Sequence, residues 1–286
     1  MRCIVALAAA CLVLGCGEKK PAPDIDKTDP VYRLSRGENR RYTISYVQSL
    51  SVSSEEERLV ADRRYDATFT LAREGEAETG FRAWITLDAL DASLVTAEGR
   101  QSYDSRQIVG KRIAATVAHK GGSPVYSDPS SMPLLNLGPG GAGGGEQNVL
   151  FLFDYAFPGL PAGIAREGDT WSTTITRTHL EGSLPVTAAV TAAHRMVGFE
   201  TVEGIQCMLV ESRLSAPLSA VTEQDGEVWQ YEGRLDGTAY WYFSPGTGAL
   251  VRLSARESSQ GATWATKVEA AIRQKTAVEV RLVHEE

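Results

Sequence analysis

Residue types that could do chemistry are spread thinly along this chain of 286 residues. The four histidines, His119, His179, His194 and His284, form neither a His-Glu-x-x-His motif nor a set with paired cysteines, the patterns typical of zinc sites. No Gly-x-Ser-x-Gly or Ser-x-x-Lys motif marks a serine nucleophile. We therefore expect a non-enzymatic protein with no catalytic residue, no metal and no cofactor.

Two further patterns resemble known functional sites, a glycosidase carboxylate pair and a dinucleotide-binding glycine motif, but lack features that such sites need. Asp88 and Asp91 could serve as the paired carboxylates of a glycosidase, but solvated strand ends explain them better. Gly138, Gly140 and Gly143 match Gly-x-Gly-x-x-Gly, yet a dinucleotide site needs a strand before the glycines and a helix after them. Proline-rich sequence precedes these glycines, which favours a flexible linker or loop.

Aromatic side chains concentrate near the C-terminal end, at Trp229, Tyr231, Tyr240, Trp241 and Tyr242. In a strand, Tyr240 and Tyr242 face one way and Trp241 the other, which favours a central strand between two apolar layers. The alternative is a cavity wall or platform that binds a lipid tail, a glycan or a partner peptide. These five residues are the candidate ligand-binding set.

The N-terminus has the features of an export signal. Met1-Arg2 precedes an apolar run whose roughly 15 residues would rise only about 22 Å as a helix, too short for a hydrocarbon core of about 30 Å. Residues 12–16, Leu-Val-Leu-Gly-Cys, resemble the lipobox of bacterial lipoproteins, which are cut before this cysteine and acylated on it with lipid such as palmitate. The resemblance implies a signal peptide over residues 1–15 and lipidation of Cys16.

Residues 16–30 predict a lipidated, disordered tether, because they carry three prolines and almost nothing to bury. Gly17 follows the cysteine where retention in the inner membrane of many Gram-negative bacteria favours Asp. By that resemblance we expect the periplasmic face of the outer membrane.

Charge and cysteine content narrow the class of protein further. The chain has 29 Lys and Arg against 36 Asp and Glu, a net charge of -7, which excludes a nucleic-acid partner.

Without the signal peptide and the lipidated Cys16, Cys207 is the only cysteine left, so no disulfide within the chain is expected. Its neighbours predict a buried strand, and no adjacent histidine supports a thiol nucleophile.

From Val31 onward, period-two segments rich in Tyr, Thr, Val and Trp predict an all-β, largely antiparallel fold of the curved-sheet or half-barrel type. We expect two β-rich lobes, residues 31–135 and 147–286, on either side of a glycine-rich linker or loop at 136–146. The expected strands are residues 41–52, 64–72, 81–94, 112–118, 125–127, 170–180, 185–197, 207–214, 227–231, 238–243 and 250–255.

Three other segments have definite expectations. Residues 264–282 place most apolar residues at even positions and the charges at odd positions, which predicts a long strand or two collinear strands with one buried face. Residues 148–153 could form a buried helical turn or a strand, and residues 54–60 a short helical turn or an exposed hairpin. The sequence Ser-Pro-Gly-Thr-Gly at 244–248 predicts a hairpin turn.

The two halves could be copies of one unit. Gly37 and Gly168 each precede an acidic residue and stand seven positions before an isoleucine in a Thr-rich segment. Gly110 and Gly237 each start a further similar segment. Glycines match by chance in β-rich chains, so duplication and coincidence both stay open.

Motifs at residues 36–38 (Arg-Gly-Glu, with Tyr42), 103–105 (Tyr-Asp-Ser), 158–161 (Pro-Gly-Leu-Pro) and 168–171 (Gly-Asp-Thr-Trp) are similar to those of a family of uncharacterised bacterial lipoproteins. Members of that family have no agreed activity. The resemblance implies an exported β-rich fold and supplies no catalytic residue.

These observations lead to one main functional hypothesis. We expect a non-enzymatic lipoprotein, anchored in the outer membrane through Cys16, that binds a partner protein or an apolar ligand in the cell envelope. Periplasmic lipid and lipoprotein carriers, which are built from curved antiparallel sheets, provide an analogy of fold only. The alternatives are a lipid-anchored envelope hydrolase and a purely structural envelope module.

Overall fold

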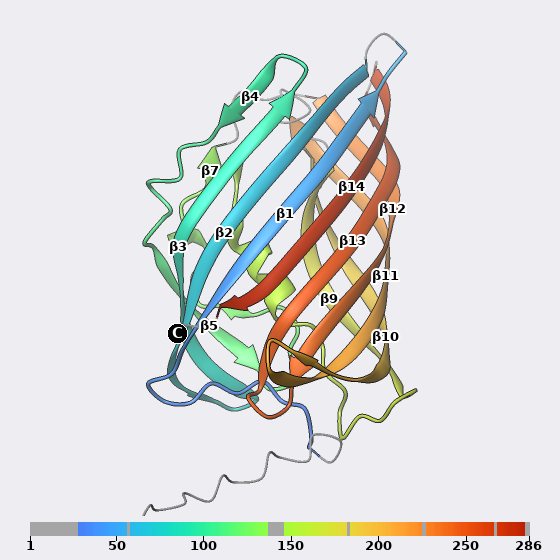
Figure 1. Ribbon diagram of the computed structural model, residues 1–286. Coiled ribbons are helices and arrows are strands. Elements are labelled where there is room, and N and C mark those ends of the chain that lie inside the picture. The colour runs from blue at the N-terminus through green and yellow to red at the C-terminus, as the bar shows by residue number, and fades with distance from the viewer. Residues whose placement is uncertain are drawn as a thin grey trace, which may run out of the picture.

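The chain folds mainly into antiparallel strands (Figure 1). The computed structural model describes residues 28–55, 58–136, 146–181, 184–224, 227–265 and 268–283. The elements are β1 (Asn39–Ser53), β2 (Arg58–Ala77), β3 (Gly80–Thr96), β4 (Gly99–Ser102), β5 (Arg112–Ala118), β6 (Val125–Tyr126), the 3₁₀ helix η2 (Pro129–Ser131), β7 (Leu135–Asn136), β8 (Glu146–Gln147), the 3₁₀ helix η3 (Val149–Ala156), β9 (Thr170–Glu181), β10 (Leu184–Val202), β11 (Ile205–Gln224), β12 (Glu227–Ser244), β13 (Ala249–Ala265) and β14 (Val268–Val283).

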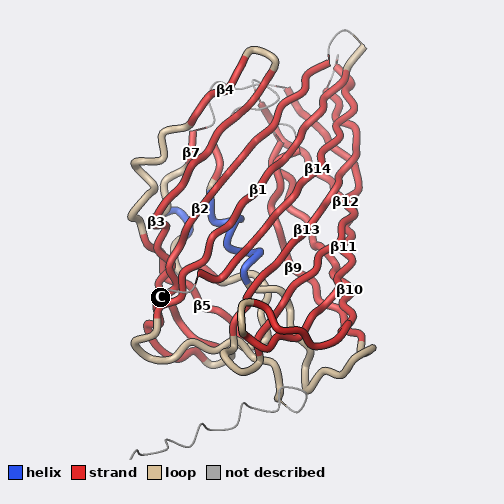
Figure 2. The backbone as a smooth tube through the Cα atoms, in the orientation of Figure 1, coloured by secondary structure: helices blue, strands red, loops and turns tan. Residues whose placement is uncertain are grey.

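Twelve of these strands form one sheet in the order β6-β5-β3-β2-β1-β14-β13-β12-β11-β10-β9, with β4 added beside β3. The sheet curls into a half-barrel, and the short helices lie inside the curl (Figure 2). The expected all-β, antiparallel, curved fold is confirmed. The remaining strands, β7 and β8, pair only with each other.

The two halves of the chain meet at the pairing of β1 with β14, where Tyr46 lies opposite Val278. Strands β1 to β6 extend from this seam on one side, and β14 to β9 extend on the other. The two expected halves therefore form two sides of one sheet and enclose one shared core.

Period-two burial explains why these segments become strands with a concave core face. In β14, Ala270, Ile272 and Val280 are buried, whereas Glu269 and Arg281, in the alternate phase of the strand, are exposed. A one-residue shift of register would reverse the two faces, so this pattern fixes the register of the strand. The expected two-faced strand is confirmed for Val268–Val283, but Trp264 and Ala265 belong to the preceding strand, β13, which pairs antiparallel with β14.

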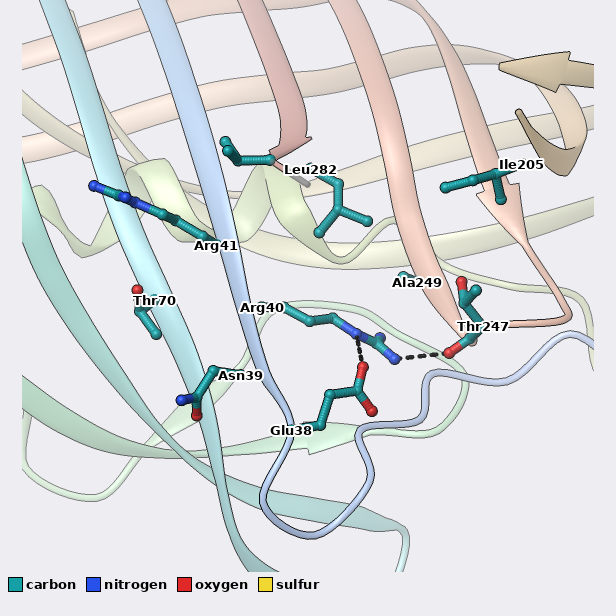
Figure 3. A pocket seen from close by; sticks show the side chains of 10 residues that line it. Glu38, Asn39, Arg40, Arg41, Thr70, Ile205, Thr247, Ala249 and Leu282 are labelled. Carbon is teal, nitrogen blue, oxygen red and sulfur yellow. Dashed lines mark hydrogen bonds and ion pairs between the residues drawn. The ribbon is translucent and has the colours of Figure 1, made fainter. Parts of the chain in front are cut away.

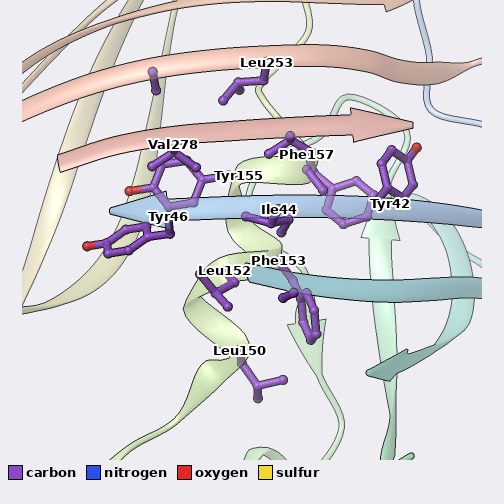
Figure 4. Close-up of a cluster of buried hydrophobic side chains, with 14 of the residues drawn as sticks. Tyr42, Ile44, Tyr46, Leu150, Leu152, Phe153, Tyr155, Phe157, Leu253 and Val278 are labelled. Atoms are coloured by element: carbon purple, nitrogen blue, oxygen red, sulfur yellow. The ribbon is translucent and has the colours of Figure 1, made fainter. Parts of the chain in front are cut away.

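The concave face is covered by η3 and the chain around it (Figure 4). The Asn148 side chain accepts a 3.0 Å hydrogen bond from the backbone N–H of Leu150 and so begins the helix. Phe153 packs against Phe69 of β2 with 4.6 Å between ring centroids. The helix is apolar nearly all round because the sheet surrounds it, and of the two open alternatives for this segment the helix is correct.

Several strands are longer than the sequence predicted. Residues 227–231 and 238–243 belong to one strand, β12, because the intervening Gly233 and Gly237 do not interrupt it. A side chain at Gly233 would meet the Tyr231 hydroxyl at 2.5 Å, and one at Gly237 would meet Glu257 Cγ at 2.9 Å. These glycines make room for neighbouring side chains that lie across the sheet, so the predicted break between residues 231 and 238 is wrong.

The predictions for two turn segments and for Cys207 can be compared directly with the structure. Residues 54–60 form the β1–β2 hairpin, whose described part contains no helical turn, and residues 244–248 form the expected β12–β13 turn. Cys207 is fully buried in β11, and burial raises the pKa of its thiol to about 12. The glycine-rich stretch 137–145, the tether 16–27 and Cys16 lie outside the described residues.

The duplication hypothesis is supported locally at one of its two places. Gly37 and Gly168 both adopt positive φ angles, 80° and 89°, in a turn just before a strand. In each turn the following acidic residue, Glu38 or Asp169, accepts a 2.8 Å hydrogen bond from the backbone N–H three residues earlier. The second correspondence is wrong, because Gly110 lies before β5 whereas Gly237 lies in the middle of β12.

Candidate functional site

The five aromatic residues singled out from the sequence do not line one surface. Trp229, Tyr231 and Trp241 face the concave side, where Tyr231 and Trp241 are almost fully buried. Tyr240 is 48% exposed on the convex side, with Tyr242 half-buried beside it. The predicted alternation is confirmed, but the expected second apolar layer is wrong, because the convex side of β12 faces solvent.

His194 is the centre of a hydrogen-bonded group near the base of the sheet, the end that holds the β12–β13 turn. Its Nδ1 lies 2.7 Å from Ser212 Oγ and its Nε2 lies 2.8 Å from Thr173 Oγ1. The Trp241 indole N–H donates to Ser212 Oγ at 2.8 Å, and Trp171 stacks on the imidazole with 5.1 Å between ring centroids. These contacts connect β9, β10, β11 and β12.

The Ser212–His194 distance suits a nucleophile and its base, but the surroundings do not. A triad needs a third group that orients the histidine, usually a carboxylate, and here that nitrogen meets a threonine hydroxyl. Ser212 is 2% exposed, and burial lowers the pKa of His194 to about 4. The group therefore joins four strands and offers a substrate no route to Ser212.

A second buried polar group fixes η3 to the sheet. Arg177 of β9 forms a 2.8 Å ion pair with Glu257 of β13, and its guanidinium lies over the Tyr155 ring, 4.4 Å from the centroid. The Tyr155 hydroxyl donates to Glu257 at 3.2 Å. Neighbouring Asp154 is also enclosed, and burial raises the pKa of its carboxyl to about 7, partly offset by Arg177.

The sequence reasoning missed this group, although a signal was present. Arg177 falls in the same period-two phase as Trp171 and Ile175, and Glu257 falls in the phase of Leu253. A charge in the buried phase of a strand predicts a buried partner. Only the curl of the sheet shows that these two residues, 80 positions apart, are partners.

The base of the sheet contains a pocket of about 470 Å³ beside the start of β1 (Figure 3). The buried Arg40 guanidinium crosses it and donates to Glu38 at 2.7 Å and to the carbonyl oxygens of Gly248 at 2.9 Å and Thr247 at 2.7 Å. Three of its five N–H groups are used in these bonds, which connect β1 to the β12–β13 turn and so hold the base of the sheet together.

The outermost strand, β9, presents the surface best suited to binding. It stands at the end of the strand order and pairs only with β10. Within the described part of the chain, no backbone hydrogen bond joins residues 170–181 to any segment other than β10. At the start of the strand the Trp171 indole N–H donates to Gly159 O at 3.0 Å, so the preceding segment contacts side chains of β9 there while its backbone edge stays open. An open backbone edge of this length is a template for another strand.

The opposite edge of the sheet is protected in several ways. β6 pairs with β5, and the backbone N–H of Ser127 donates to Ala114 O at 2.9 Å. Near the base, the segment 157–160 is joined to residues 120–122 by two backbone hydrogen bonds of 2.8 Å. The contrast leaves β9 as the open side of the half-barrel.

The side chains of β9 fit an interface. On the convex side Ser172, Thr174, Thr176 and Thr178 are all exposed and uncharged. Neither Lys nor Pro, two of the usual guards of an edge strand, occurs between Thr170 and Glu181. The charges of the strand are Arg177, which is paired on the concave side with Glu257, and Glu181 at its end. The strand is rich in threonine, which favours extended backbone.

The concave side of β9 is incompletely covered. Ile175 is only half-buried, whereas Val190, its partner on β10, is fully buried. An added strand would extend the sheet beyond Ile175 and complete the burial of its side chain.

A shallow pocket of about 590 Å³ lies beside this edge, over the first residues of β9. It forms where the small Ser172 and Ala193 stand between the longer Arg195 and Arg213. Arg195 pairs with Glu211 at 3.0 Å. The pocket lining therefore carries one positive charge in excess, that of Arg213 on β11.

Comparisons with known proteins supply no family for this chain: no family model matches the sequence, and no curated protein matches it. In the ranges that the structure describes, no group of His, Cys, Asp and Glu is placed to hold a metal ion. Over the same ranges, every helix is too short or too polar to cross a membrane.

Proposed function

We propose that this chain is a lipid-anchored protein of the bacterial cell envelope that binds a partner protein by accepting a strand at the free edge of β9. The observation that carries the proposal is the 12-residue edge strand, which has no backbone partner beyond β10 in the described residues. Strand addition uses backbone hydrogen bonds for affinity and side-chain contacts for specificity.

The arrangement of the ends is compatible with anchoring through Cys16. The first described residues lie at the base of the sheet, where Lys120 contacts Asp29 at 2.6 Å and the Tyr32 N–H donates to His119 O at 2.7 Å. A lipid on Cys16, followed by the polar tether, would hold the base near the outer membrane. β9 would then extend away from the membrane, toward envelope partners.

A partner protein is better supported than an apolar ligand held inside the sheet. The concave residues that would line such a site, including Ile44 and Val278, are already buried in one core cluster with the side chains of η3 (Figure 4). The hydrolase alternative has less support still, because the one close Ser–His pair is buried.

A photoactivatable cross-linker at Thr176 tests the proposal in cells that produce the full chain. Thr176 lies on the free edge, whereas Thr238 is equally exposed but lies on β12 in the middle of the sheet. We expect a protein adduct from position 176, its loss when Thr174 is also changed to Pro, and no such adduct from position 238. Identical adducts from both positions, or none from position 176, would contradict strand addition.

A further inference from the structure

We infer that the partner at this edge is a second copy of the same chain, paired antiparallel through β9 with a two-fold axis at Thr174. The inference rests on the proposed strand addition and names its occupant. A two-fold interface uses one surface twice, so the edge must be complementary to itself.

Charge is the first requirement, and β9 meets it. The chain has a net charge of -7, which opposes self-association in general. The convex side chains of residues 170–178 nevertheless carry no charge. The nearest charge on that side, Arg195 of β10, pairs with Glu211, and the exposed Arg213 lies two strands inward on β11. Two copies can therefore approach at this edge without bringing like charges together.

Side-chain pairing is the second requirement. In an antiparallel register centred on Thr174, Ser172 of one copy faces Thr176 of the other, and Thr170 faces Thr178. Each convex pair then consists of two hydroxyl side chains. The same kind of pair already exists inside the sheet, where Thr178 Oγ1 lies 2.9 Å from Thr187 Oγ1.

The concave pairs in this register are also compatible. Ile175 faces Thr173 of the second copy, which extends the cover of the half-buried isoleucine. Trp171 faces Arg177 of the second copy, and because the Arg177 guanidinium is already paired with Glu257 of its own chain, this position brings no unpaired charge to the interface. Within residues 170–178, no pair in the register places two like charges opposite each other.

Engineered disulfides test both the partner and the register on the full chain. Residues directly opposite in an antiparallel pair have Cα atoms about 4.5–5.5 Å apart, within the span of a disulfide. We expect Thr174→Cys to form a reducible dimer with itself under mild oxidation, and a Ser172→Cys chain to cross-link with a Thr176→Cys chain. Thr191→Cys is the control, because Thr191 is exposed and lies opposite Thr174 one strand inward on β10. It should stay monomeric, and native Cys207 is buried.

A charge exchange gives a second measurement that needs no oxidation. Thr174→Lys and Thr174→Glu each place like charges on the axis, so each purified variant should lose the dimer that the unmodified chain forms in sedimentation. An equal mixture of the two variants should recover the dimer.

The outcomes distinguish the inference of a second copy from the proposed strand addition on which it rests. A chain that is monomeric in both measurements, but still gives a Thr176 adduct with another protein, overturns the second copy and leaves strand addition intact. Equal disulfide formation at Thr174 and Thr191 also overturns it. If the Thr176 adduct is absent as well, both proposals are wrong.

Discussion

At the scale of single residues, glycines on the concave face determine where large side chains can lie. The Tyr231 ring lies across β12 and β13, over Gly233 and Gly261. Glu257 similarly lies over Gly237 and reaches toward Arg177. A glycine in a strand weakens it slightly, and here the gain is space for a side chain that the core uses.

Gly261→Ala tests this role of glycine. The added methyl would meet the Tyr231 hydroxyl at 2.6 Å and the Glu232 carbonyl oxygen at still shorter range. We expect a loss of about 1–3 kcal/mol in the free energy of unfolding, measured by urea titration, as for other overpacked cores. Gly198→Ala is the matched control, because its methyl would meet nothing within 4 Å. Equal stability of the two variants would contradict the packing argument.

At the scale of elements, η3 joins the two sides of the half-barrel. Its aromatic residues pack on β1 and β2, while Tyr155 bonds to the Arg177–Glu257 pair from β9 and β13. A buried ion pair adds little stability compared with apolar packing, but losing one partner leaves an uncompensated charge. The helix and the free strand β9 therefore share one buried polar contact.

The buried carboxyl of Asp154, next to Tyr155 in η3, makes the free energy of unfolding depend on pH. Burial raises the pKa of its carboxyl from 3.8 to about 7. Between these values the folded chain keeps a proton that the unfolded chain has lost, so this carboxyl lowers the free energy of unfolding as pH rises. Asp154→Asn removes the effect, and the variant should gain stability relative to the unmodified chain up to about pH 7 and then level off.

Urea titrations from about pH 5 to pH 8 measure this difference. His194 titrates in the opposite sense, because burial lowers its pKa to about 4, but it is present in both proteins and cancels. Asp104→Asn is the control. The pKa of Asp104 is held near 2 by hydrogen bonds from Arg106, so its removal should give a constant difference over this range. A constant difference for Asp154→Asn as well would contradict its raised pKa.

At the scale of the whole molecule, the first and last long strands of the chain pair with each other inside the sheet. β1 pairs with β14 along 13 residue pairs, so the first and last strands lie side by side in the middle of the sheet. Closing this seam leaves two outer edges, of which the β5 edge is covered and the β9 edge is open. The overall topology thus determines which strand is available to a partner.

Cys16→Ser tests the proposed anchoring of the whole protein. Without the acylated cysteine we expect the chain to leave the membrane fraction for the soluble fraction, or to accumulate as an uncleaved precursor, as judged by fractionation and immunoblotting. One acyl chain binds a membrane only marginally, whereas two or more hold firmly, so the shift should be large. A Cys16→Ser chain that stays processed and membrane-bound would contradict the lipobox resemblance, and Cys207→Ser is the control with unchanged location.

Much of the secondary structure could be predicted, because burial in a strand leaves a period of two in the residue types. The alternation in residues 268–282 and the buried surroundings of Cys207 both led to correct predictions. Strand ends and the continuity of β12 could not be predicted, because the glycines that suggest turns there are contacts for Tyr231 and Glu257. The aromatic residues of β12 also led to a wrong prediction, a second apolar layer, because the convex face of this strand is open to solvent.

The sequence by itself determined an all-β chain, the buried face of its strands and the absence of familiar catalytic motifs, because each depends on residues close together in the sequence. Only the tertiary structure decided that Arg177 meets Glu257 and that β9 is left without a second neighbour. Backbone hydrogen bonding is nearly the same for every residue type, so a strand does not encode its neighbours locally. The order of strands follows from how the whole sheet curls around η3, and that order creates the free edge on which the proposed function rests.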